Sequence, residues 1–406
     1  MEIINPSNFP VELGLKTLEK RVEKHQSNTS LKIGLPKERS NDEKRICLTP
    51  SGVSVLVANG HEVYIEKKAG YDANFTDQEY ADAGASIAYS KEDLFKNSEM
   101  IVKVAPPHIQ ELKLLQKNQI LFSAVHLGNQ TENFFKVLLQ KNIAAFGFEF
   151  IQEPDNTFPI VRMMHEITGS MSIQIAAHYL ENTHDGQGIM LGGISGVPPA
   201  TVVILGGGII AEYAARTALG YGAQVFVLDT NLARLRHLEN ALDRRIITAI
   251  ANHQYLSSAL KYADVVIGSP LEEGNRAPCW VTEPMVSNMK DGSVIVDTVI
   301  DQGGCVATSE PTTHSDPVFV KYGVLHYCVP NIPSSVARTA TYALNNVISS
   351  FLLEIGDAGG INEAIWANTT LRHGIYSYKG HITKKNLAKT YDLPFRDIDM
   401  LIASQL

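Results

Sequence analysis

The chain has 406 residues, of which 44% are hydrophobic and 19% are charged, and its formal net charge is −8. Because the chain is acidic and has no evident stripe of lysine and arginine, this composition argues against a nucleic-acid-binding protein. The length predicts two domains, and no apolar run approaches the roughly 20 residues that a membrane span needs. We therefore expect a soluble globular protein with neither nucleic acid nor membrane as a partner.

The first residues predict an accessory arm rather than a secretion signal. They lack a basic stretch followed by an apolar one, and residues 10–26 have the pattern of a short amphipathic helix. The four cysteines, Cys47, Cys279, Cys305 and Cys328, are far apart and show no Cys-x-x-Cys spacing. This usage favours reduced thiols in a cytoplasmic protein, and we expect no metal site.

Short β-rich runs alternate with helical patterns through the first half of the chain. The strand-like runs are residues 31–35, 62–66, 100–104, 120–124 and 144–150. Thr49 and Pro50 open one of the helices between them as N-cap and first helical residue, and Gly60 closes that helix. Alternation of this kind predicts a parallel sheet with helices on both faces.

The second half repeats the alternation after a long helical pattern over about residues 165–182. Its strand-like runs are residues 201–204, 225–228, 246–251, 265–267, 294–296 and 324–329. Ser334 or Ser335 then caps a long apolar helix over about residues 336–355, which we expect to run back to the first unit.

Together these patterns predict an α/β fold of two doubly wound, Rossmann-like domains, the first of them discontinuous and completed by the C-terminal segment. We expect residues 1–160 to form a substrate domain and residues 161–337 to form a nucleotide-binding domain. Residues 338–406 then form the connecting helix and the segment that returns to the substrate domain.

Residues 201–229 carry a dinucleotide-binding fingerprint. A β-branched run ends in Gly206-x-Gly208-x-x-Ala211, a helical pattern follows, and a second apolar run ends at Asp229. Gly206 allows the tight turn, Gly208 lets the backbone approach a pyrophosphate, and Ala211 lets helix and strand pack closely. Asp229 is placed to accept hydrogen bonds from a ribose 2′-hydroxyl and to repel a 2′-phosphate, which favours NAD over NADP.

Three long segments resemble the alanine dehydrogenase/transhydrogenase family. They begin GLPKERSNDEKRICLTP, MLGGISGVPPATVVILGGG and VIVDTVIDQGGCVATSE, and the likeness covers about residues 32–380. The resemblance implies reversible oxidative deamination of L-alanine to pyruvate and ammonium with NAD. It also implies a homo-oligomer, commonly a hexamer, with a dimer as the other assembly we consider.

The resemblance also assigns site residues. It implies that Arg45 clamps the substrate carboxylate, for which a planar guanidinium is well matched. It implies that His126, at the carboxyl end of a predicted strand, is the general acid/base. Asp301 is implied as the second catalytic acid, with Asp297 as its structural competitor, and Asn331 is implied to lie near nicotinamide and substrate.

Two further residues are assigned to the nucleotide side outside the glycine fingerprint. The resemblance places Arg234 near the adenosine, although a solvated helix residue is the other interpretation. His165 stands where the family has a serine, and we include it with the cofactor-binding residues.

One departure affects the substrate side. The family usually reads Lys-Val-Lys-Glu-Pro where this chain has Lys103-Val104-Ala105-Pro106-Pro107. The resemblance implies that the second lysine polarises the substrate carbonyl, and here that position is alanine. Lys103 lies two residues back, on the same strand face but displaced by roughly 6.6 Å. Lys103 or His165 is our candidate replacement.

Three functions stay open from the sequence. The first is an NAD-dependent alanine dehydrogenase, which we favour. The second is a related oxidoreductase that acts on another 2-oxo or amino acid, and the third is a nucleotide-binding oligomer of low activity. Ala105 argues against an alanine dehydrogenase with the family's usual substrate site. Arg45, His126 and Asp301 argue against an oligomer of low activity.

Overall fold

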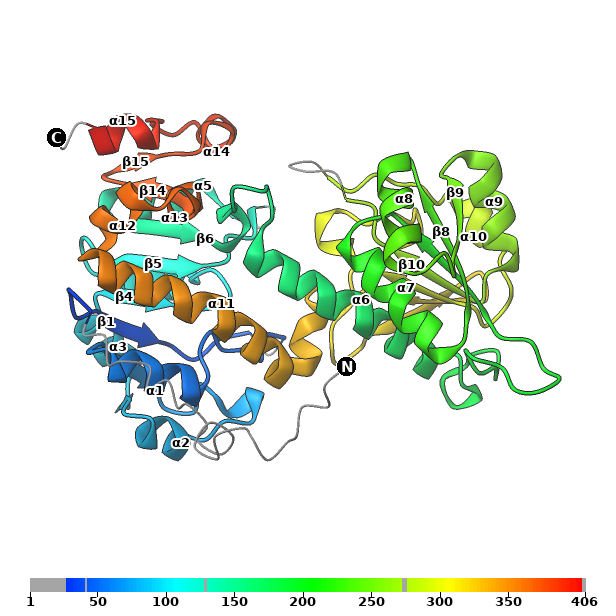
Figure 1. Cartoon of the computed structure of the whole chain (residues 1–406), viewed down its shortest axis with the longest axis horizontal. Coiled ribbons are helices and arrows are strands. Elements are labelled where there is room, and N and C mark those ends of the chain that lie inside the picture. The colour runs from blue at the N-terminus through cyan, green and yellow to red at the C-terminus, as the bar shows by residue number, and fades with distance from the viewer. Residues whose placement is uncertain (1–26, 41, 128–129, 272–275, 404–406) are drawn as a thin grey trace, which may run out of the picture.

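The computed structural model describes residues 27–403 except 41, 128–129 and 272–275. In that part of the chain, two α/β units are joined by the long helices α6 (Pro159–Tyr179) and α11 (Ala337–Ala358), as Figure 1 shows. The helix predicted over residues 10–26 lies outside the described residues. Within the described part, no helix has both the length and the apolar character needed to cross a bilayer.

The first unit is an eight-stranded sheet with strand order β15-β14-β6-β5-β4-β1-β2-β3. The strands β1 to β6 pair in parallel, whereas β14 runs antiparallel to β6 and β15 antiparallel to β14. The N-terminal elements are β1 (Lys32–Leu35), α1 (Pro50–Ala58), β2 (Glu62–Glu66), η2 (Tyr71–Ala73), α2 (Asp77–Asp82), β3 (Ser86–Ala88), α3 (Lys91–Asn97), β4 (Met100–Val102), α4 (Ile109–Leu114), β5 (Ile120–Ser123), α5 (Glu132–Gln140), β6 (Ala144–Gly147) and η4 (Phe148–Phe150). The C-terminal elements are α12 (Ile361–Ala367), α13 (Thr369–Gly374), β14 (Ile375–Tyr378), β15 (His381–Ile382), α14 (Lys385–Thr390) and α15 (Ile398–Ala403).

The second unit is a seven-stranded sheet with strand order β12-β13-β11-β10-β7-β8-β9, in which only β12 pairs antiparallel. Its elements are η5 (Asn182–His184), β7 (Thr201–Leu205), α7 (Ile209–Tyr221), β8 (Gln224–Asp229), α8 (Leu232–Ala241), β9 (Ile247–Ile250), α9 (His253–Tyr262), β10 (Val265–Gly268), α10 (Glu283–Val286), β11 (Val294–Asp297), η6 (Ile300–Gln302), β12 (Val318–Lys321), β13 (Val324–Tyr327) and η7 (Ile332–Val336).

Each sheet has helices on both faces. Since successive strand residues point to opposite sides, neighbouring residues of one strand are buried in different cores. In β7, Val202 belongs to the core beneath α6 and α7, whereas Val203 belongs to the core beneath α9 and α10. In β4, Met100 and Ile101 divide in the same way between two further cores. This burial explains why the strands read as continuous apolar runs.

The predicted fold class is confirmed, including the return of the C-terminal segment to the first sheet through β14 and β15. Helix α1 begins as predicted, since the Thr49 side chain accepts a hydrogen bond from the Gly52 N–H and Pro50 is its first residue. Gly60 follows the end of that helix with a φ of 92°.

The predicted serine cap of α11 is wrong. The helix begins after η7, and its N-cap residue Val336 makes no side-chain capping bond. The Ser334 hydroxyl instead accepts from the Lys44 N–H at 2.9 Å, and the Ser335 hydroxyl donates to the Ile332 carbonyl at 2.7 Å. A tertiary contact with the first unit thus uses the side chain that the local pattern assigned to capping.

Two further details differ from the expected strands. The run over residues 144–150 ends as a strand at Gly147, after which Phe148–Phe150 forms a 3₁₀ turn. The short strands β3 and β12, which the sequence analysis did not predict, lie at sheet edges. In β3 the apolar run is too short to indicate a strand, whereas the three apolar residues of β12 were overlooked.

Candidate active site

The turn after β7 requires glycine at position 206. Gly206 has a φ of 100°, and its N–H donates to the Leu228 carbonyl at 2.8 Å. A Cβ atom here would lie 2.7 Å from the Ser269 carbonyl oxygen, closer than such atoms approach. The turn therefore combines a left-handed backbone with a close approach to the neighbouring strand end.

The start of α7 is open where an anion would bind. Gly208 is the N-cap residue and has no side-chain capping bond, and a Cβ atom there would meet nothing within 4 Å. Ala211 is completely buried one turn later. On the other side, a Cβ at Gly169 of α6 would lie 2.4 Å from the Ile210 carbonyl, so the two helices pack backbone to backbone. The exposed N–H groups and the helix dipole suit a phosphate.

Asp229 ends β8 and faces the glycine turn. Its side chain is buried, one carboxylate oxygen accepts from the Asn231 N–H at 2.6 Å, and a Cβ at Gly207 would lie 3.0 Å from the other. The half-exposed Arg234 guanidinium lies 3.9 Å from that second oxygen. These residues fit a dinucleotide, with Asp229 as the acceptor for ribose hydroxyls.

A cavity of about 220 Å³ lies where the two units meet. Both units contribute to its wall, which Ser40, Asp42, Glu43, Ala105, His126, Thr312, Thr313, Val329, Pro330 and Asn331 line. Two of the sequence-predicted site residues, His126 and Asn331, thus face one space from opposite units, next to Ala105.

His126 is held by its backbone. It follows β5 with a φ of 50°, which is uncommon outside glycine. The Glu149 carboxylate, from η4 after the neighbouring strand β6, accepts from the N–H groups of Val125 at 3.0 Å and His126 at 2.9 Å. This carboxylate stabilises the unusual turn and leaves the imidazole exposed to the cavity.

Asp301 lies in η6, on the second unit, and interacts electrostatically with His126. Burial raises the pKa of the Asp301 carboxyl, and the charge of His126 acts in the opposite direction. The competitor Asp297 has different surroundings. It is completely buried and accepts from the backbone N–H groups of Cys305 at 3.0 Å and Val299 at 3.2 Å, which is a structural arrangement.

Arg45 is buried and paired with Glu43. The guanidinium Nε and Nη2 donate to the two Glu43 carboxylate oxygens at 2.8 and 2.6 Å, and Nη1 contacts the Met164 sulfur at 3.1 Å. Burial acts to raise the pKa of Glu43, but Arg45 and Asn331 outweigh it and hold that pKa below its usual value. The fork predicted for a substrate carboxylate is thus already occupied on one edge by Glu43.

Asn331 bridges the units at this pair. Its Nδ2 donates to the Glu43 carboxylate at 3.0 Å and to the Asp42 carbonyl at 3.2 Å, from a left-handed backbone with a φ of 65°. Further along, the Ile46 N–H donates to the Thr341 hydroxyl at 3.1 Å and the Thr49 N–H donates to the Asn345 amide oxygen at 3.1 Å. Helix α11 therefore fixes the segment that carries Glu43 and Arg45.

Lys103 is enclosed by carboxylates. Its ammonium is almost completely buried and lies 2.9 Å from Glu38 and 3.3 Å from Glu111, and Lys91 lies 2.6 Å from Glu111 on the other side. Burial alone would lower the pKa of Lys103, but the two carboxylates outweigh it and raise that pKa. This pairing favours a structural role for Lys103 over the predicted contact with substrate.

Ala105 contributes to the walls of two cavities. It lines the cavity at the unit junction and also a second one of about 520 Å³, whose wall includes Glu38, Arg39, Lys103 and His108. The other candidate replacement, His165 of α6, has its pKa lowered by burial to about 4. Near neutral pH His165 is therefore uncharged, and it supplies no cation in place of the missing lysine.

Sequence reasoning missed three acidic residues that organise the site. Glu43 holds Arg45, Glu38 holds Lys103 and accepts from the Val104 N–H at 2.7 Å, and Glu149 holds the His126 turn. The only local signal was an acid two residues before Arg45. The partners of Glu38 and Glu149 lie 65 and 23 positions away, beyond the range of a motif.

Comparison with known proteins agrees with the resemblance drawn from the sequence. The family models described as "Alanine dehydrogenase/PNT, N-terminal domain" and "Alanine dehydrogenase/PNT, C-terminal domain" match residues 34–168 and 172–385. A protein of Methanococcus maripaludis named alanine dehydrogenase is 44% identical over 364 residues, which cover 89% of this chain and 97% of that protein.

Solved structures extend the likeness to three dimensions. One titled L-alanine dehydrogenase has a TM-score of 0.84 and 39% identity, and the match covers 89% of this chain and 99% of that one. A transhydrogenase from Sinorhizobium meliloti has a TM-score of 0.73 at 22% identity, covering 87% of this chain and 99% of its own, and so shares the fold.

Proposed function

Since the chain belongs to the alanine dehydrogenase/PNT family, we propose that it catalyses the reversible oxidative deamination of L-alanine to pyruvate and ammonium with NAD. The observation that carries this proposal is the cavity at the unit junction, which His126 of one unit and Asn331 of the other both line. Asp301 does not line this cavity, but it interacts electrostatically with His126, and we assign it as the partner of His126 in proton transfer.

NAD is the cofactor we propose, held by the glycine turn, the start of α7 and Asp229. The open space over Gly208 leaves room for a pyrophosphate. The buried Asp229 carboxylate disfavours a 2′-phosphate, and Arg234 lies beside the position that the adenosine would take. When bound, NAD supplies the oxidant for the amino-acid Cα–H bond.

His126 is the proposed general acid/base. In the deamination direction a neutral imidazole accepts a proton from the attacking water and returns it to the carbinolamine nitrogen. The ring, neutral again, then accepts the carbinolamine hydroxyl proton as the C–N bond breaks and ammonia leaves. In the amination direction the protonated ring returns that proton to the pyruvate carbonyl oxygen. The Glu149 contacts keep the ring aimed into the cavity through both steps.

Asp301 and the Glu43–Arg45 pair are the proposed electrostatic partners. A carboxylate at Asp301 stabilises the imidazolium of His126 and the cationic iminium that precedes water attack. Arg45 and Asn331 bind the substrate carboxylate, Arg45 through Nη1, the guanidinium nitrogen that Glu43 does not occupy and that contacts the Met164 sulfur in this structure. Because position 105 is alanine, Arg45 and Asn331 bind the substrate carboxylate without the lysine that the family usually has there.

We further propose a cytoplasmic homo-oligomer, a hexamer or a dimer. The resemblance to the family supports assembly, and the free cysteines are consistent with a reducing compartment. Sedimentation velocity on the full chain would distinguish the two assemblies by mass.

The proposed function is tested by reductive amination with purified protein. NADH oxidation is followed with ammonium and a panel of 2-oxo acids that includes pyruvate, 2-oxobutyrate and 2-oxoglutarate, with NADPH as the comparison cofactor. We expect pyruvate with NADH to give the highest kcat/KM. If no 2-oxo acid turns over while NADH still binds, the proposed activity is refuted.

A further inference from the structure

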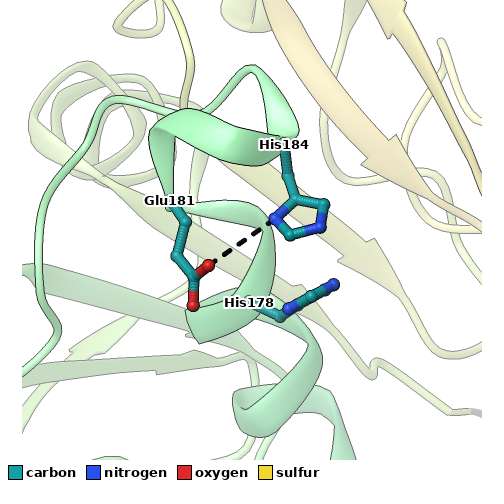
Figure 2. Close-up of side chains that lie close together, drawn as sticks. All are labelled: His178, Glu181 and His184. Atoms are coloured by element: carbon teal, nitrogen blue, oxygen red, sulfur yellow. Dashed lines mark ion pairs between the residues drawn. The ribbon is translucent and has the colours of Figure 1, made fainter.

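A cluster of two histidines and one glutamate lies at the far end of α6. His178 is in the last turn of the helix, Glu181 follows the helix directly, and His184 ends η5, as Figure 2 shows. One possible ligand atom from each residue lies within 4.8 Å of the other two. The two imidazole ring centres are 3.8 Å apart, and the Glu181 carboxylate lies 3.7 Å from His184 Nδ1.

We propose that His178, Glu181 and His184 bind a divalent transition metal ion of the zinc class. Two imidazoles and a carboxylate form a mixed nitrogen and oxygen set that suits Zn²⁺, Co²⁺, Ni²⁺ or Cu²⁺. Hard cations such as Mg²⁺ prefer oxygen ligands and are disfavoured here. Three protein ligands leave a further position for water.

The spacing needs only side-chain rotation to reach bonding geometry. Bonds of about 2.0–2.2 Å in a tetrahedral site place neighbouring ligand atoms roughly 3.4 Å apart. The present separations, of at most 4.8 Å, are therefore about 1.4 Å too long at the widest. Because His178 and Glu181 are exposed, these side chains close that gap without disturbing a packed core.

The backbone beneath the cluster is fixed. The Gly186 N–H donates to the Glu181 carbonyl at 3.1 Å and the Gly188 N–H donates to the Leu180 carbonyl at 2.8 Å. A Cβ at Gly186 would lie 2.2 Å from the Tyr179 carbonyl, so glycine lets this loop fold directly onto the helix end. The three ligands consequently project from a preformed turn, which lowers the ordering cost of binding a metal.

The charges at this position also favour a cation. The Glu181 carboxylate lies at the C-terminal end of α6, where the helix dipole is negative. In the described part of the chain, the ion pairs of Glu181 involve His184 alone. A divalent ion offsets both the carboxylate and the negative end of the helix dipole.

The cluster is separate from the catalytic cavity. None of its three residues lines the cavity at the unit junction. A bound metal would link η5 to the C-terminal end of α6, the helix that connects the two units. The absence of Cys-x-x-Cys spacing, on which the expectation of no metal site depended, does not bear on a His-x-x-Glu-x-x-His cluster.

The test is a calorimetric titration of the purified protein with zinc chloride, with magnesium chloride as the comparison. We expect one zinc ion per chain, no magnesium binding, and at least a roughly tenfold weaker zinc affinity in His178→Ala and in His184→Ala, since even indirect ligand supports are worth that much. His237→Ala is the matched control. Like His184, His237 lies 3.7 Å from a glutamate carboxylate, here that of Glu212, but among the described residues no second histidine pairs with that carboxylate. The control should bind zinc as the unaltered protein does.

Three results would overturn the proposal. The first is that the unaltered protein binds no zinc at about 100 µM, a concentration near the dissociation constant of a weak site. Alternatively, both ligand variants keep the full affinity and stoichiometry, which would place zinc elsewhere, for example at the exposed Cys279. Equal weakening in His237→Ala would likewise show that the effect is not specific. Dehydrogenase activity is not the readout, so failure of the proposed function leaves this test unaffected.

Discussion

The nucleotide side and the substrate side of the cleft are built differently. On the nucleotide side, glycine backbone, an uncapped helix start and one carboxylate define the surface. On the substrate side, buried side chains of opposite charge pair with one another, as in Glu43 with Arg45 and Lys103 with Glu38. A site formed by backbone groups tolerates the loss of one side-chain contact. A site formed by buried ion pairs is left with an unpaired buried charge when one partner is removed.

The strongest test of this contrast is Lys103→Met. Removing the ammonium leaves the buried Glu38 carboxylate without its cation, while Lys91 still pairs with Glu111, and we expect the free energy of unfolding to fall by about 3–5 kcal/mol. Chemical denaturation measures this loss. The double variant with Glu38→Gln should regain part of it, because the buried side chain at position 38 is then neutral.

The same variant decides whether Lys103 contacts substrate. If Lys103→Met keeps its stability while the KM for pyruvate rises, the lysine acts in the substrate site and its structural assignment fails.

A second prediction concerns the helix that connects the two sides. The pKa of His165 is lowered to about 4 in the folded protein, against an ordinary value near 6.5, so the unfolded chain binds more protons between these values. Stability should fall as the pH drops through this window, by up to about 3 kcal/mol. His165→Gln should flatten the dependence of unfolding temperature on pH between 6.5 and 4.

The exposed His237, with a side-chain exposure of 71%, supplies the control for that experiment. His237→Gln should leave the dependence unchanged. Equal slopes in the unaltered protein and in His165→Gln would contradict the buried, neutral state of His165.

On the nucleotide side, Asp229→Asn should change cofactor choice and little else. Loss of the charged acceptor weakens NADH binding and removes the repulsion of a 2′-phosphate, while Arg234 stays in place. We expect the preference for NADH over NADPH to narrow by roughly 30-fold, about 2 kcal/mol, as measured by the two dissociation constants. An unaltered preference would mean that Asp229 does not face the ribose.

The smallest expected effect comes from restoring the family's lysine with Ala105→Lys. Because Ala105 lines the cavity at the unit junction, the new ammonium should pair with the substrate carboxylate and lower the KM for pyruvate about tenfold. Ala105→Met has similar length without the charge and should not lower it. If the methionine variant improves KM equally, packing rather than charge explains the gain.

The same contrast explains what the sequence could predict. The nucleotide side follows from residues 201–229 because a turn, a helix start and a strand end are local features. Their geometry requires glycine at a φ of 100° and a small buried residue one turn into the helix, so residue type and spacing carry the information. The alternation of strands and helices was likewise sufficient for the fold class.

The substrate side could be predicted only in part. Asn331 reaches Glu43 across 288 positions and Glu38 reaches Lys103 across 65, and no local pattern encodes such pairs. The resemblance supplied Arg45 and His126, but it did not indicate that Glu43 occupies one edge of the guanidinium. The serine cap of α11 failed for the same reason, since Ser334 is used by a distant backbone N–H.

The central claim is that proton transfer by His126 belongs to the cavity between the units, whereas nucleotide binding belongs to the second unit alone. Its most direct test compares His126→Ala with the unaltered protein in two measurements, pyruvate-dependent NADH oxidation and fluorescence titration of NADH. We predict that kcat falls by about 10²–10⁴-fold while the NADH dissociation constant is unchanged. Full turnover in the variant, or loss of NADH binding together with activity, would contradict this account.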